Sequence, residues 1–127
     1  LPPMLTKTLF LIYSVFLVAT DNPYEIWQNN HAVDQFNQKK VIEAHDQFAE
    51  LLSEKPFHPL FQFNLGASFL GIEEMEKAMM MYKEVLKLNP LPPELQFTAN
   101  FNLGVLYGTK DLFNLNKALF YRHFHRV

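Results

Sequence analysis

Residues 60–70 read LFQFNLGASFL, and this stretch decides the fold of the chain. Its apolar residues recur at intervals of three and four, which is the spacing of one face of an α-helix. Gly66 carries no side chain, so it predicts a place where a second helix passes close by. A short polar stretch then leads to a second apolar stripe that contains Ala78 and Tyr82, and Pro90 ends it. We therefore predict two helices joined by a short turn.

The same types of residue recur 34 positions apart around this stretch. The pairs are a small residue, a second alanine, an aromatic and a closing proline, namely Ala32 and Gly66, Ala44 and Ala78, Phe48 and Tyr82, and Pro56 and Pro90. This pattern resembles the tetratricopeptide (TPR) repeat, a helix–turn–helix unit. The resemblance implies an all-α solenoid in which neighbouring repeats stack on one another.

The TPR register divides the chain into an N-terminal segment, residues 1–22, and a domain, residues 23–127. The repeats cover about residues 25–58, 59–92 and 93–127. The third is altered, because the Asn-Leu-Gly of residues 64–66 returns at residues 102–104, which is 38 rather than 34 positions later. Ala118 lies 14 residues after Gly104, whereas Ala78 lies 12 after Gly66. We expect about three helix–turn–helix repeats, preceded by an apolar N-terminal helix.

Length and composition agree with one modest domain. The chain has 127 residues, of which 49% are hydrophobic and 19% charged. The formal net charge of −2 lacks the basic character that binding to nucleic acid demands, so we expect no nucleic-acid partner. The absence of cysteine removes disulfides, thiolate metal sites and a thiol nucleophile.

Residues 9–19, LFLIYSVFLVA, form an uninterrupted apolar run after Lys7. This layout is typical of a secretory signal peptide, and the run is shorter than the roughly 20 residues that span a membrane. An ordinary buried helix is the alternative. The cleavage site is poor, since Leu17 or Val18 stands where a small residue is preferred, so retention as a membrane anchor stays open. We predict an exported protein, periplasmic or associated with the inner membrane.

The TPR resemblance implies a ligand groove, because the first helix of each repeat lines the concave face in that family. Carried over place by place, the candidate groove residues are Asn29, Asn30, Val33, Phe36, Phe63, Asn64, Ala67, Leu70, Phe101, Asn102 and Val105. Asn30, Asn64 and Asn102 share one place of the repeat. They are expected either to hold a peptide backbone or to form hydrogen bonds within the domain.

The groove has no lysine or arginine at the ligand places, whereas TPR domains that bind chaperones hold a carboxylate with basic side chains. An apolar peptide or helix fits this groove better than an anion. The leading interpretation is therefore a scaffold that binds a protein or peptide partner.

The sequence gives no support for an enzyme, a metal site or a cofactor. His123 and His125 are two residues apart, so on a helix they point to different faces. His31, His45 and His58 are scattered, and neither a phosphate-binding glycine loop nor a nucleophile elbow is present. We expect a protein without catalytic activity.

Two further features bear on partners. Residues 22–27, NPYEIW, resemble the start of small exported TPR proteins of bacterial aerotolerance (Bat) operons, which implies a scaffold acting with von Willebrand A-domain proteins. Residues 118–127 carry several apolar side chains where a solenoid normally ends in a polar cap. The alternative function is therefore structural self-assembly, driven by the N-terminal apolar segment and by the last helix. Whether the N-terminal segment occupies the groove of its own domain or that of a neighbouring copy stays open.

Overall fold

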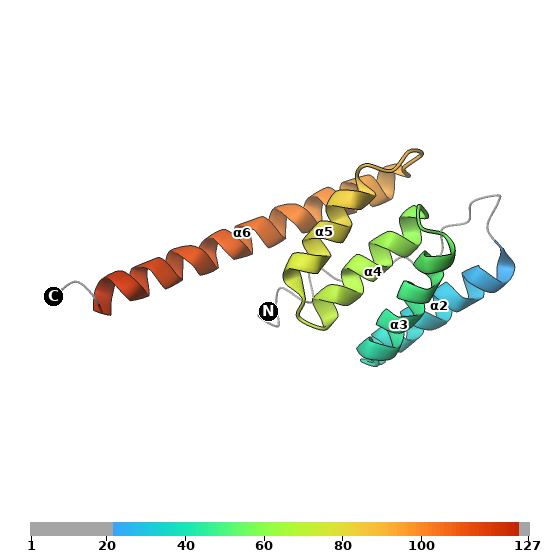
Figure 1. The fold of residues 1–127 in the computed structure, drawn as a ribbon, viewed down its shortest axis with the longest axis horizontal. Coiled ribbons are helices and arrows are strands. Elements are labelled where there is room, and N and C mark those ends of the chain that lie inside the picture. The colour runs from blue at the N-terminus through green and yellow to red at the C-terminus, as the bar shows by residue number, and fades with distance from the viewer. Residues whose placement is uncertain (1–21, 125–127) are drawn as a thin grey trace.

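The computed structural model describes residues 22–124, which fold into five α-helices with no strand among them (Figure 1). The helices are α2 (Pro23–Asn37), α3 (Val41–Glu54), α4 (Pro59–Gly71), α5 (Met75–Val85) and α6 (Pro93–Phe124). The predicted all-α class is therefore confirmed. The apolar segment expected at the N-terminus lies outside the described residues.

Two helix pairs, α2 with α3 and α4 with α5, are closed by the same turn. Lys39 and Glu73 lie 34 residues apart, and both have a positive φ, of 66° and 63°. The amide that follows each of them donates to the carbonyl five residues back, at 2.9 Å to Gln35 and 2.8 Å to Phe69. This bond satisfies a carbonyl at the end of the first helix of each pair. The repeat seen in the sequence is thus a repeat of turn geometry.

Glycine permits the closest helix contacts. A Cβ added at Gly66 would lie 3.1 Å from the Met81 Cβ and 3.1 Å from the Tyr82 ring, so the predicted close approach is present. A Cβ at Gly71 would lie 2.5 Å from a Val41 methyl group. The φ of Gly71 is not positive, so this glycine is needed for space rather than for a left-handed turn.

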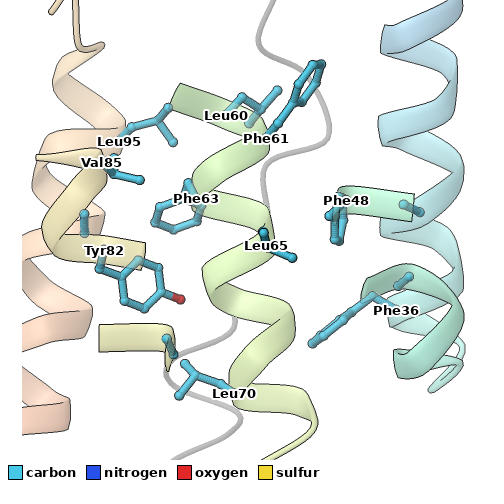
Figure 2. Close-up of a cluster of buried hydrophobic side chains, with 14 of the residues drawn as sticks. Phe36, Phe48, Leu60, Phe61, Phe63, Leu65, Leu70, Tyr82, Val85 and Leu95 are labelled. Atoms are coloured by element: carbon cyan, nitrogen blue, oxygen red, sulfur yellow. The ribbon is translucent and has the colours of Figure 1, made fainter. Parts of the chain in front are cut away.

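The core surrounds α4, which is buried on most of its circumference. On one side, Phe63 and Leu60 lie toward Tyr82 of α5 and Leu95 of α6 (Figure 2). On the other side, Phe36 of α2 and the buried Phe48 of α3 complete the same apolar cluster. Because α4 is covered from both sides, few of its side chains remain open to a partner.

The third repeat is not a helix pair, which corrects the prediction for residues 93–127. Residues 93–124 form the single helix α6, with no turn at residues 109–112. Its first half packs on α5 through Leu95, Ala99 and Leu106, all fully buried. From Asp111 to Leu119 every side chain is exposed, and this half of α6 extends beyond the other helices (Figure 1).

The third repeat continues as one helix because a turn costs free energy that only burial of the following helix can offset. A left-handed residue other than glycine costs about 1–2 kcal/mol, so a turn such as that at Lys39 needs compensation. The helix that follows it supplies this compensation, because Phe48 and Leu51 of α3 are buried. From Asp111 to Leu119 no side chain of α6 is buried, and the backbone continues as one helix. None of the described helices is both long and apolar enough to cross a membrane.

Candidate functional site

The predicted groove residues are mostly buried. On α2, Asn29, Val33 and Phe36 are buried and Asn30 is half-buried. On α4 and α6, the buried members are Phe63, Asn64, Ala67, Leu70 and Asn102, while Val105 is half-buried. Phe101 is the exposed member of the set, at 43%. The structure therefore places most of these residues inside the domain rather than on an open surface.

Asn64, one of the asparagines at the shared place of the repeat, shows why these positions are buried. The Asn64 amide nitrogen donates to the Asn29 carbonyl oxygen at 2.9 Å, and both side chains are buried. This bond joins α2 to α4 and satisfies polar atoms that burial would otherwise make costly. It favours the internal role over the ligand-binding role for Asn64.

Asn102 and Tyr82 form a second buried polar group, between α6 and α5. Burial raises the pKa of the Tyr82 hydroxyl, and the Asn102 side chain opposes part of that rise. The Tyr82 hydroxyl and both amide atoms of Asn102 have no hydrogen bond of good geometry within residues 22–124. A fully buried phenol of raised pKa stays neutral near pH 7, so it is neither a base nor a nucleophile there.

His45 lies between the two helix pairs. Its Nδ1 lies 2.8 Å from the Ser68 hydroxyl, which donates to the Leu65 carbonyl at 2.7 Å. Since that hydroxyl hydrogen is engaged, the His45 Nδ1–H is the donor in the first bond. Burial is the main cause that lowers the pKa of His45 below its ordinary value of 6.5; Lys77 lowers it further and Asp46 opposes both.

We expect the stability of the domain to fall on acidification because of His45. The folded chain binds this proton less tightly than the unfolded chain, so the contribution of His45 is complete above about pH 6.5 and is lost below it. Urea midpoints measured at about pH 8 and about pH 5 should therefore drop more for the wild-type chain than for His45→Gln. An equal drop in both proteins would contradict this assignment.

Among the described residues, no three histidine, cysteine, aspartate or glutamate side chains gather as a metal-binding group.

An open cleft lies where the sequence analysis placed no site. It has a volume of about 1350 Å³ and is formed by the end of α3, the α3–α4 loop, the end of α5 and the α5–α6 loop. The described residues that line it are Leu52, Lys55, Pro56, Phe57, His58, Pro59, Gln62, Met81, Glu84, Lys87, Leu88, Asn89, Pro90, Leu91, Pro92 and Pro93. The sequence signal that could have found it is the cluster of prolines in the two loops that connect successive helix pairs.

The chemistry of the cleft is mainly apolar. Phe57 is 79% exposed in the α3–α4 loop, the most exposed of the large apolar side chains described. The charged side chains at its edge are paired. The Lys87 Nζ lies 3.0 Å from a Glu84 carboxylate oxygen, and the Lys55 Nζ lies 2.6 Å from a Glu25 carboxylate oxygen. Prolines also lack a backbone N–H, so much of the loop surface offers no donor. Such a cleft suits an apolar chain segment better than a charged one.

A second open surface is the face of α6 that does not touch α5. Phe97 and Phe101 lie on it with ring centroids 6.5 Å apart, and both are exposed. Gly104 and Gly108 continue the same face, and a Cβ built on either would meet nothing within 4 Å. This face therefore has no covering element among the described residues.

Comparison with protein-family models, with curated proteins and with solved structures finds no match to this chain.

Proposed function

We propose that this protein is a scaffold built of TPR-like helix pairs that binds an apolar peptide or helix of a partner protein. The observation that carries the proposal is the apolar cleft between the α3–α4 and α5–α6 loops. The partner's binding segment is assigned to this cleft because most residues of the expected concave groove are buried.

Size favours a peptide over a small molecule as the occupant. Pockets for small molecules have volumes of about 300–1,000 Å³ and enclose most of their ligand. The cleft is larger, at about 1350 Å³, and it is open along the two loops. Aromatic residues, phenylalanine included, are enriched at protein interfaces, and Phe57 is an exposed aromatic that lines the cleft.

Location is proposed from the N-terminal segment and the resemblance to the Bat-operon proteins. The apolar run of residues 9–19 supports export to the periplasm, with or without retention at the inner membrane. Partners would then be other proteins of the bacterial envelope. The alternative function, self-assembly, rests on a different surface, the open face of α6.

Selection of peptides from a random library on the immobilised full-length chain tests the cleft. We expect the selected peptides to be rich in large apolar residues, and Phe57→Ser to weaken their binding at least about tenfold in fluorescence polarisation. Ile42→Ser is the matched control, because Ile42 is 68% exposed on α3 and lies outside the cleft. Peptides that bind the Phe57→Ser and wild-type chains equally would refute the proposed site.

A further inference from the structure

The face of α4 that contains Gly66 and the face of α6 that contains Gly104 are equivalent in sequence but differ in the structure. Residues 63–66 read FNLG, and residues 101–104 read FNLG again. At Gly66 the return helix α5 lies against the face, with Met81 and Tyr82 within 3.1 Å of an added Cβ. At Gly104 nothing among the described residues lies within 4 Å of an added Cβ. One of two equivalent faces is thus covered, and the other is open.

The second half of α6 carries the sequence of a covering helix. The α5 residues Met75, Ala78 and Met79 are spaced like Leu115, Ala118 and Leu119 of α6. In α5 the alanine and Met79 are buried and Met75 is half-buried, whereas all three α6 residues are exposed. The chain therefore contains both an uncovered face and a segment with the apolar spacing to cover it.

One molecule cannot bring these two parts together while α6 is straight. Gly104 and Arg122 are 18 residues apart in one helix, which separates them by about 27 Å. The segment that reaches the open face must then belong to another molecule. Two copies can satisfy each other, because an antiparallel arrangement places the second half of each α6 on the first half of the other.

We propose that this chain forms a symmetric dimer in which the two α6 helices pack antiparallel, each covering the Gly104 face of the other. The contact runs along one face of α6, the α6 stripe, which consists of Phe97, Phe101, Gly104, Gly108, Leu112, Leu115 and Leu119. The spacings within it are three or four residues, and it includes no charged residue. Reciprocal contacts of this kind generate a closed two-fold pair rather than a fibre.

The area available is sufficient for such a dimer. Five large side chains of the α6 stripe are exposed, from Phe101 at 43% to Phe97 at 72%. A side chain of this size has on the order of 200 Å² of surface, of which roughly half is exposed here, so each copy can bury on the order of 500 Å² through the five. The pair then reaches the roughly 1,000 Å² that a specific interface needs. The two glycines let the helix axes approach closely where the second half of the partner's α6 lies on this face.

This dimer is independent of the peptide cleft. The cleft uses the α3–α4 and α5–α6 loops, whereas the α6 stripe begins at Phe97 and extends away from them. Loss of peptide binding and loss of dimerisation can therefore be observed separately.

Cross-linking of introduced cysteines tests the arrangement, because the natural chain has none. The full-length variant with Gly104→Cys and Arg122→Cys is treated with a short bismaleimide, which cannot bridge the roughly 27 Å between these positions in one helix. We expect a covalent dimer on denaturing gels, with residues 104 and 122 joined in peptide mapping. The control pairs Gly104→Cys with Lys117→Cys, an exposed position on the opposite side of the helix, and should give little dimer.

A link between residues 104 and 122 within one chain would overturn the proposal, because it would mean that α6 bends back on itself. Equal dimer yields from the test and control pairs would overturn it as well. Circular dichroism shows that both variants are folded before they are compared.

Light scattering on chains without cysteine provides the second measurement. We expect the wild-type mass to rise toward that of a dimer with concentration, and Gly108→Arg to weaken association at least tenfold. Gly108 is exposed with nothing within 4 Å of an added Cβ, so the folded monomer accommodates the larger side chain. A wild-type chain that stays monomeric would refute the α6 dimer. A Gly108→Arg chain that associates as strongly as wild type would refute it too, and association through residues 1–21 would give that result.

Discussion

Phe63→Ala is expected to lower the free energy of unfolding by about 3–5 kcal/mol, the usual cost of removing a buried phenylalanine side chain. Phe63 is fully buried on α4, and its ring centroid lies 5.3 Å from that of Tyr82 on α5. Figure 2 shows Phe63 on the side of α4 that faces Tyr82, Val85 and Leu95. Truncation therefore leaves a cavity where α4 meets α5. Urea denaturation followed by circular dichroism measures the loss.

Phe101→Ala is the matched control, since Phe101 holds the equivalent position on α6 and is 43% exposed. Its truncation should cost much less, because little packing is lost at a site that solvent already reaches. The TPR register alone predicts that both residues face a ligand and that both truncations leave the fold intact. If Phe63→Ala unfolds at the same urea concentration as wild type, the groove interpretation is the better one for Phe63.

The sequence predicted the helix pairs well because their signals are local and repeated. Gly66 marks a close contact between α4 and α5, and the residues that follow each first helix form the same turn 34 positions apart. Apolar spacing also identified Ala78 and Tyr82 as buried. These features depend on residues that are close in the chain or on contacts within one helix pair, which is why one sequence is enough to predict them.

The open surfaces could not be predicted in the same way. Register says which side of α4 a residue such as Phe63 occupies, but it does not say how deeply the neighbouring helices bury that side. The predicted turn after the first helix of the third repeat was wrong for a related reason. Thr109 and Asp111 stand where Gly71 and Glu73 make the turn, and whether a turn forms there depends on the burial that a return helix gains. That gain is a property of tertiary contacts rather than of local spacing.

The cleft depends on three-dimensional proximity. Pro56 and Pro90 were interpreted in the sequence as ends of repeats, which is what each does locally. Only the packing of α4 on α5 brings their two loops to opposite sides of one recess, with Phe57 exposed in it. A repeated turn position and the lining of the cleft thus share the same residues, and the sequence pattern reveals the first feature only.

The two FNLG segments allow a direct measurement of what a covering helix does to one position. Gly66→Leu is expected to destabilise the chain by about 1–3 kcal/mol or more, because the Met81 Cβ and the Tyr82 ring already lie 3.1 Å from where a Cβ would be. Both neighbours belong to the α5 helix, and the larger side chain can be accommodated only if α5 moves away from α4.

Gly104→Leu should have the opposite sign. Gly104 is exposed in the middle of α6 with nothing within 4 Å of an added Cβ, so replacement of glycine by a good helix former contributes up to about 1 kcal/mol. The two variants should therefore differ in unfolding free energy by about 2 kcal/mol or more, although the substitution and the local sequence are the same. The comparison is made at a chain concentration where light scattering gives the monomer mass, so that dimer contacts do not contribute. Equal destabilisation by both substitutions would mean that a helix covers Gly104 within the monomer, and α6 would then have to turn back as α4 and α5 do.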